Sequence, residues 1–291
     1  GEWSNPQPVW DTGTNDLYFN MVESDNEVYL IWQKVKCNVD SDDISEILTT
    51  MLENSEICYA KLDKNTNTFT HQGFITDNET TDMQPVLVVD GDNITAVWIS
   101  NKENDVFGFS NNDIMFSDLS DGIWSEPESV ATINGYVSEV TASYVNGSLE
   151  IAAVSIDENG SNSISIIKDG SLSQIISDEN VKSGIKYNNS NLYWVSNGVL
   201  YENSSDGSVA IGDDDVISAS YKFVENDNFF SIVWLSSNDI YASINYDGNW
   251  SSPIKLLEGS KYFAETISIY DYDIRLSDNA EWSVILKNYD N

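Results

Sequence analysis

Basic side chains, histidine and cysteine are scarce in this chain of 291 residues. Its 48 aspartates and glutamates are opposed by 13 lysines and arginines, which gives a formal net charge of −35. Such a charge repels phosphate backbones and anionic lipid, so roles in nucleic-acid binding and at membrane surfaces are disfavoured. The single histidine, His71, argues against a multi-histidine metal centre and leaves little scope for a Ser-His-Asp triad. We expect His71 to have a surface or packing role.

Long apolar runs and cysteines are also rare. No run approaches the roughly 20 apolar residues that a membrane-spanning helix needs, so membrane insertion is not expected. The two cysteines, Cys37 and Cys58, flank one inserted segment. In an intracellular protein they would be free thiols. We expect instead a disulfide, worth about 3 kcal/mol in the chain-entropy model. This pairing and the aromatic composition favour a secreted or cell-surface protein.

Hairpin signals, by contrast, are abundant. The stretch 229–257 contains three strand-like runs, and Asp247-Gly248 separates the second from the third. A type I′ turn needs positive φ at both central residues, so Asp-Gly between alternating runs is a strong hairpin signal. With the run that precedes it, the stretch predicts a four-stranded antiparallel meander of roughly 40 residues.

Variants of this meander recur along the whole chain. In each unit the second strand has an apolar core centred on a tryptophan or its substitute: Trp32, Trp98, Val154, Trp194, Trp234 and Leu286. Six such units predict an all-β fold, a six-bladed β-propeller of four-stranded antiparallel blades that forms a single domain over residues 1–291. The approximate units are 12–77, 78–132, 133–179, 180–214, 215–259, and 260–291 together with 1–11.

The last unit is short of strands, and the N-terminus supplies a matching one. Trp3-Ser4-Asn5-Pro6 repeats the phrase Trp-Ser-x-Pro that begins at Trp124 and again at Trp250. We therefore expect the closing blade to be shared by the N- and C-termini. Proline is tolerated there because the fourth strand forms the outer edge of a blade.

The turn phrases SDLSDGIW and SINYDGNW resemble those of six-bladed β-propellers of the sialidase-like (BNR-repeat) superfamily. The Asp-box of that superfamily reads Ser-x-Asp-x-Gly-x-x-Trp, whereas here the aspartate and glycine are adjacent, so the resemblance implies architecture only. Sialidases hold the carboxylate of their substrate with three arginines, because the planar guanidinium donates two parallel hydrogen bonds. This chain has only Arg275, and sialidase activity is not expected.

Two insertions indicate where a function was added to the repeats. They follow the second strands of the first two units, at 36–56 and 101–112, and the first contains the helix-like DDISEILTTML. Since the units are neighbours, the insertions should lie side by side on the loop face. Phe107 and Phe109 in the second insertion either tuck under their own loop or form a stacking platform for a sugar or partner. Trp10 lies in the connection into the first inner strand and is placed on the same side.

Acidic residues recur fifteen or sixteen positions before the second-strand centres. They are Asp16, Asp82, Glu139, Asp178 and Asp271. Inner strands begin near the mouth of a propeller channel, so these residues predict a ring of carboxylates. Three interpretations remain open: solvated turn residues, a cation site for an ion such as Ca²⁺, or the acid and nucleophile of a glycoside hydrolase, drawn from Asp16, Asp82 and Glu139.

Taken together, the sequence predicts an extracellular, monomeric, non-catalytic binding propeller that recognises a glycan or protein partner on its loop face and requires no cofactor. The expected ligand-binding residues are Trp10, Phe107, Phe109, Asp82 and Glu139. A glycoside hydrolase with paired carboxylates at the channel mouth is the alternative. A structural spacer within a larger surface protein is a third interpretation.

Overall fold

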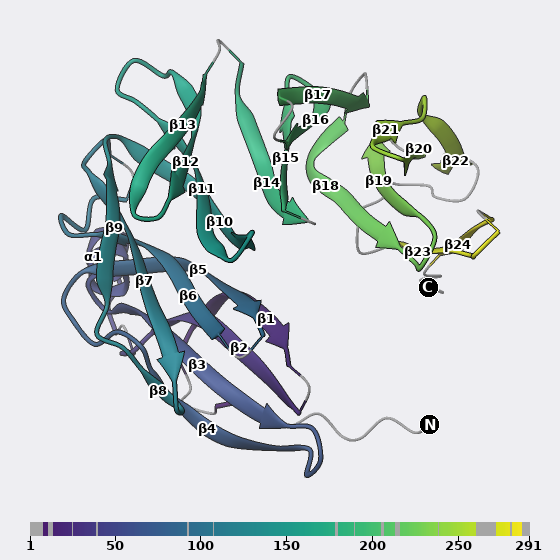
Figure 1. Ribbon diagram of the computed structural model, residues 1–291. Helices are drawn as coiled ribbons and strands as arrows, with labels where there is room; N and C mark the ends of the chain where they lie inside the picture. The colour runs from purple at the N-terminus through teal and green to yellow at the C-terminus, as the bar shows by residue number, and fades with distance from the viewer. Residues whose placement is uncertain are drawn as a thin grey trace. The chain divides into compact units, whose positions relative to one another are not determined.

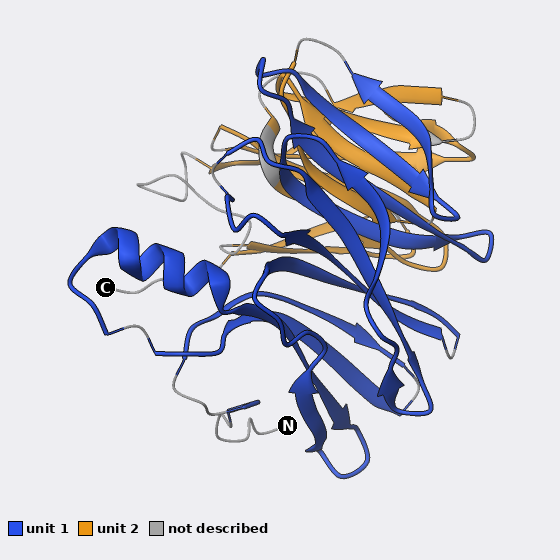
Figure 2. Ribbon diagram, turned by 90° about the vertical axis from the view of Figure 1, so that its left-hand side faces the viewer, with its two compact units in different colours: residues 1–178 blue, residues 179–291 orange. Residues whose placement is uncertain are grey.

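A computed structural model describes most of the chain in two compact units, residues 1–178 and 179–291 (Figure 2). Each unit is treated by itself below. Within the described residues, no helix is long and apolar enough to cross a membrane. The described residues are 8–10, 14–24, 26–38, 40–91, 93–106, 108–177, 180–188, 190–204, 207–212, 216–237, 239–259, 272–279 and 281–286.

The first sheet of unit 1 is a four-stranded antiparallel meander (Figure 1). Its strands are β1 (Asp16–Glu23), β2 (Glu27–Val35), β3 (Ser55–Asp63) and β4 (Thr68–Phe74). The predicted insertion helix is confirmed as α1 (Ile44–Glu53), which lies between β2 and β3 and begins at the N-cap residue Asp43. Figure 2 shows α1 outside the stack of strands of unit 1.

Two further sheets complete unit 1, and both are antiparallel. The second sheet contains β5 (Thr81–Asp90), β6 (Asn93–Asn101), β7 (Asn112–Ser120), β8 (Ile123–Trp124) and β9 (Glu128–Ile133). Its short strands β8 and β9 both pair with β7, so together they form one interrupted edge. The third sheet contains β10 (Tyr136–Val145), β11 (Ser148–Ile156), β12 (Asn162–Lys168) and β13 (Ser171–Ser177).

Unit 2 repeats the pattern. A four-stranded sheet contains β14 (Lys182–Asn188), β15 (Asn191–Ser196), β16 (Val199–Ser204) and β17 (Gly207–Gly212). A five-stranded sheet contains β18 (Val216–Glu225), β19 (Phe230–Ser236), β20 (Asp239–Tyr246), β21 (Asn249–Trp250) and β22 (Ile254–Glu258). A pair follows, β23 (Tyr272–Leu276) and β24 (Trp282–Leu286). The predicted sharing of a closing blade by the termini concerns residues outside the described ones and stays a prediction.

The second strand of each of the first five sheets in chain order is largely apolar on both faces because both faces are covered. In β6 every residue after Asn93 is buried, and Trp98 is 0% exposed. One cluster of buried side chains in unit 1 joins the first sheet to the second, and another joins the second to the third. A strand covered on both faces needs consecutive apolar residues instead of alternation.

The turns match their sequence prediction. Asp121 and Gly122 have φ of 52° and 79°, and Asp247 and Gly248 have 50° and 82°. Positive φ at both central residues is the type I′ signature. In each case the serine of the Trp-Ser-x-Pro phrase then bonds back to the strand, since Ser125 Oγ accepts from Asp118 N and Ser251 Oγ accepts from Ile244 N, both at 3.1 Å.

The predicted disulfide is wrong, because Cys37 and Cys58 are both free thiols. The register explains why. Cys58 is buried in β3 opposite Trp32, and Cys37 lies five residues beyond Trp32, past the end of β2. Five nearly extended residues span on the order of 15 Å, whereas bridged cysteines need Cα atoms within about 7 Å.

Candidate functional site

Three polar groups meet where β1 begins: the carboxylate of Asp16, the indole nitrogen of Trp32 and the ammonium of Lys34. Oδ1 of Asp16 accepts hydrogen bonds from Nε1 of Trp32 at 2.8 Å and from Nζ of Lys34 at 2.7 Å. The Lys34 side chain is only 2% exposed, so this ion pair satisfies a buried ammonium. The Asp16 side chain is 48% exposed, and no hydrogen bond to its Oδ2 occurs within the described residues. Asp16 is therefore a fixed carboxylate with one oxygen available.

A backbone irregularity sits beside Asp16. Tyr18 has a φ of 46° although it is not glycine, and the pairing of β1 with β2 shifts register between Leu17 and Asn20. An aromatic residue in the left-handed region is uncommon and strained, and such positions cluster at functional sites. The bulge leaves Tyr18 and Phe19 60% and 78% exposed.

These groups line a pocket that contains two of the predicted site residues, Trp10 and Asp16. We call it the first-sheet pocket; its volume is about 420 Å³, and it is lined by Pro8, Val9, Trp10, Asp16, Leu17, Tyr18, Phe19, Leu30 and Trp32. Trp10 packs edge-on against Trp32, with ring centroids 6.3 Å apart, and Nζ of Lys34 lies 5.7 Å from the Trp10 ring. Cation and neighbouring rings hold Trp10 in place.

The second predicted acid, Asp82, occupies the equivalent place in the next sheet but is inaccessible. Nε1 of Trp98 donates to its Oδ1 at 3.0 Å and Nδ2 of Asn78 donates to its Oδ2 at 2.9 Å. Asp82 is 1% exposed, and burial raises its pKa to about 6; the charge of Glu56 adds to this effect, while hydrogen bonds from Ser100 and Asn78 oppose it. A ligand on the surface cannot reach this carboxylate.

An ionic clamp built on one buried carboxylate closes the base of the first insertion. Nζ of Lys36 binds Oε1 of Glu56 at 2.7 Å and Oδ1 of Asp77 at 2.8 Å. The Glu56 side chain is 0% exposed and also accepts from Thr76 Oγ1 and the Asn78 amide. The two ends of the insertion are therefore fixed to each other.

The insertions lie side by side, as expected. Thr81 connects them: its amide donates to Asn104 Oδ1 at 2.8 Å, and its hydroxyl lies 3.1 Å from the Leu52 carbonyl in α1. Phe109 in the second insertion is 51% exposed, and Phe107 lies outside the described residues. Phe109 is not among the residues that line the first-sheet pocket.

The ring of carboxylates stays a prediction, because the structure describes one of its three remaining members. Glu139 lies in β10 at a register shift, opposite Val154, and is partly buried. Asp178 and Asp271 lie outside the described residues. Within the described residues no three histidine, cysteine, aspartate or glutamate side chains gather so as to hold a metal ion. The cation site stays a prediction.

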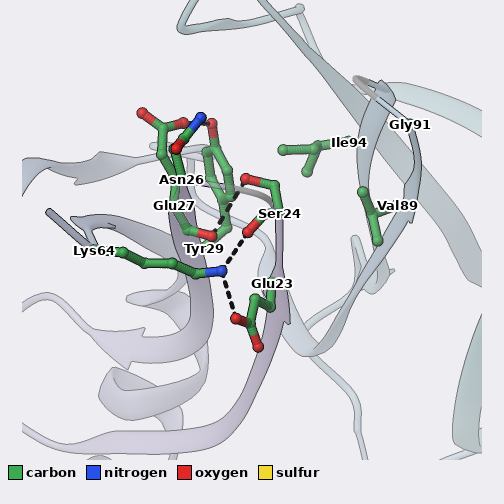
Figure 3. Close-up of a pocket in the computed structure, with 9 residues that line it drawn as sticks. All are labelled: Glu23, Ser24, Asn26, Glu27, Tyr29, Lys64, Val89, Gly91 and Ile94. Atoms are coloured by element: carbon green, nitrogen blue, oxygen red, sulfur yellow. Dashed lines mark hydrogen bonds and ion pairs between the residues drawn. The ribbon is translucent and has the colours of Figure 1, made fainter.

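A larger cavity of about 910 Å³ lies at the other end of the first two sheets (Figure 3). Figure 3 shows Lys64 reaching Glu23 and the Ser24 carbonyl from one wall, while Val89, Gly91 and Ile94 form the other. Glu27, in turn, accepts from Tyr29 and pairs with Lys61. Because its charged groups already satisfy one another, this cavity is the weaker candidate.

Sequence reasoning missed Lys34, Glu56 and Tyr18. Lys34 follows Trp32 by two residues, so strand alternation places both on one face, and this signal was available. Glu56 lies opposite Lys34 in the pairing of β2 with β3, and this position follows from the sequence only once the strand register is known. The positive φ of Tyr18 could not be predicted from its residue type.

Comparisons with known proteins identify the fold alone. No protein-family model matches the sequence, and no curated protein matches it either. A sialidase of Trypanosoma rangeli, bound to the inhibitor DANA, matches with a TM-score of 0.50 and 11% identity over 94% of this chain and 54% of the sialidase chain. This chain thus spans about half the length of the sialidase.

Two other solved structures extend the comparison. A puromycin-hydrolysing peptidase of Mycobacterium tuberculosis has a TM-score of 0.54 and 10% identity over 93% of this chain and 42% of the peptidase. A family 117 glycoside hydrolase of Zobellia galactanivorans has a TM-score of 0.47 and 11% identity over 85% and 73% of the two chains. The all-β chain therefore has the sialidase-like propeller architecture that its sequence predicted.

Proposed function

We propose that this chain is a non-catalytic binding propeller and that it recognises a glycan in the first-sheet pocket. The observation that carries the proposal is the half-exposed Asp16 carboxylate, fixed at one oxygen and open at the other, beside Trp10 and Trp32. The volume of about 420 Å³ lies in the range of small-molecule sites.

The pocket has the two kinds of group that a sugar needs. Indole and phenyl faces cover the apolar C–H face of a pyranose ring, and a carboxylate oxygen accepts its hydroxyl protons. Lys34 holds the Asp16 carboxylate in place through their ion pair without entering the pocket lining. The fold itself leaves the ligand open, since it occurs in both a sialidase and a peptidase.

Catalysis by paired carboxylates has less support. A glycoside hydrolase places two carboxyl groups about 5–9.5 Å apart around the scissile bond. In the described lining of the first-sheet pocket Asp16 is the one acid, and Asp82 is buried behind Asn78 and Trp98. We therefore keep the hydrolase as the alternative to be excluded by assay.

A secreted or cell-surface location remains part of the proposal. Without a bridge between Cys37 and Cys58, it rests on the acidic and aromatic composition alone. An extracellular protein of this charge stays soluble near glycans without binding anionic lipid or nucleic acid.

A glycan array followed by titration calorimetry with the best oligosaccharide tests the pocket. Trp10→Ala and Asp16→Asn should each weaken binding at least 10-fold, with Tm reported for each variant. Phe109→Ala, which removes an exposed ring on the second insertion, is the matched control and should bind like the wild type. The reverse pattern would move the site to the insertion.

A screen of aryl glycosides and polysaccharides tests the alternative. We expect no turnover by the wild type. Turnover that is abolished by Asp16→Asn or Glu139→Gln would establish the hydrolase and remove the non-catalytic assignment.

A further inference from the structure

Helix α1 has an apolar stripe that the described residues of unit 1 leave open. The α1 stripe consists of Ile44, Ile47, Leu48, Met51 and Leu52, spaced as one face of a helix. None of its residues is buried, and Ile44 and Leu48 are 73% and 42% exposed. Leu52, at the end of the stripe, packs against the core of unit 1. The helix is thus anchored at one end and displays the rest.

Acidic residues border the α1 stripe. They are Asp40, Asp42, Asp43, Glu46 and Glu53, and residues 38–55 contain no lysine, arginine or histidine. The nearest cation in sequence before them, Lys36, is bound to Glu56 and Asp77. The segment that displays the stripe therefore contributes negative charge and no cation, and its acids are called the rim below.

Hydrogen bonds hold both ends of the helix. Asp43 Oδ1 accepts from the Ser45 amide at 2.8 Å, and Ser41 Oγ donates to the Glu46 carboxylate at 2.8 Å. These two hydrogen bonds fix the first turn. Asn54 Nδ2 donates to the Thr50 carbonyl at 2.8 Å at the last turn. A partner would lose little affinity to ordering α1.

The charge of the rim selects the occupant. A second copy of the chain would bring two acidic rims together, and an anionic membrane would meet the same repulsion. An amphipathic helix with Lys and Arg beside its apolar face matches both features, because its apolar residues cover the stripe while its cations pair with the rim. We propose that the α1 stripe docks a basic amphipathic helix of a partner protein, independently of the first-sheet pocket.

Fluorescence anisotropy tests this with a labelled 14-residue peptide of leucines and lysines patterned as an amphipathic helix, titrated with the full chain at 150 mM NaCl. Ile44→Ser combined with Leu48→Ser should weaken binding at least 10-fold. This double variant keeps every charge, so general attraction between a basic peptide and an acidic protein survives it. Ile123→Ser with Leu172→Ser, which changes residues 73% and 55% exposed elsewhere in unit 1, is the matched control and should bind as the wild type does.

A second pair of substitutions keeps the proposal testable if the first pair unfolds α1. Asp42→Lys with Glu53→Lys retains the stripe and should also weaken binding at least 10-fold. Equal affinity of wild type and Ile44→Ser/Leu48→Ser would overturn the proposal, as would equal binding of a leucine–glutamate peptide. Dimerisation in sedimentation that the serine pair abolishes would assign the stripe to a second copy. Binding to phosphatidylserine vesicles that the same pair abolishes would assign it to a membrane.

Discussion

Nε1 of Trp98 donates to Oδ1 of Asp82 at 3.0 Å, and in the preceding sheet Trp32 makes the same bond to Asp16 at 2.8 Å. In both sheets the carboxylate stands sixteen residues before the tryptophan and at the start of the first strand. The regular spacing of these acids therefore has a structural cause in the first two sheets. Each acid anchors the indole of the second strand, and only Asp16 keeps access to solvent.

Asp82 gives stability a distinctive dependence on pH. Burial raises its pKa to about 6 from 3.8, so the protonated form is favoured in the folded chain. The contribution of protonated Asp82 to the free energy of unfolding is fully present below pH 3.8, and it is lost as the pH rises through about 6. Urea unfolding of wild type and Asp82→Asn from pH 4 to 7 should show the wild type losing up to about 3 kcal/mol relative to the variant. Parallel profiles would contradict the raised pKa.

Two of the three Trp-Ser-x-Pro tryptophans, Trp124 and Trp250, should respond differently to loss of the indole nitrogen. Nε1 of Trp250 donates to Glu202 Oε2 at 2.7 Å. Trp124, at the same place in its sheet, packs on Tyr59, and its buried Nε1 has no hydrogen-bond partner within the described residues. Trp250→Phe should lower the free energy of unfolding by about 1.5–3 kcal/mol, and Trp124→Phe by less than about 1. A larger loss at Trp124 would show that its nitrogen is satisfied.

The two thiols should differ in accessibility. Cys58 is buried, and burial raises the pKa of its thiol, whereas Cys37 lies in the partly exposed insertion. Ellman's reagent should label one thiol in the native chain and two in guanidinium chloride, because the thiolate is the reacting form. Dithiothreitol should leave Tm unchanged. A Tm that falls on reduction would show that Cys37 and Cys58 form a disulfide after all.

The clamp at the base of α1 should be worth more than a surface ion pair. Lys36→Met leaves the fully buried Glu56 without its cation and should cost about 1–3 kcal/mol, with faster hydrogen exchange in residues 44–53. Lys102→Met is the control, because Lys102 is 66% exposed, so its pair with the largely buried Asp113 at the second insertion is open to solvent on the side of the cation. That change should cost less than about 1 kcal/mol. Equal costs would mean that the clamp does not hold the insertion.

Local features were predictable because local residues cause them. Asp247-Gly248 needs no distant partner to form its turn, and 44–53 has a helical apolar spacing with a capping aspartate before it. The disulfide prediction failed because it required a register. Placing Cys58 opposite Trp32 instead of near Cys37 depends on how β2 and β3 pair, and the insertion length hides that pairing.

The candidate site was predictable only in pieces. Trp10 and Asp16 were each singled out, but the pocket that joins them depends on the bulge at Tyr18. Asp82 was singled out as accessible and is instead buried, because Asn78, Trp98 and the nearby Glu56 surround it. Burial of a carboxylate follows from tertiary packing, which no spacing rule along the chain contains.

The Ser-x-Pro break between β8 and β9, and again between β21 and β22, also shapes how molecules meet one another. It divides the edge strand of each of these sheets into two pieces. The pieces have two and six residues in β8 and β9, and two and five residues in β21 and β22. Proline contributes no amide proton, and so short a border offers few free carbonyl and amide groups to a foreign strand. We therefore expect these two sheet edges to resist the strand-by-strand addition that begins amyloid growth in concentrated solutions.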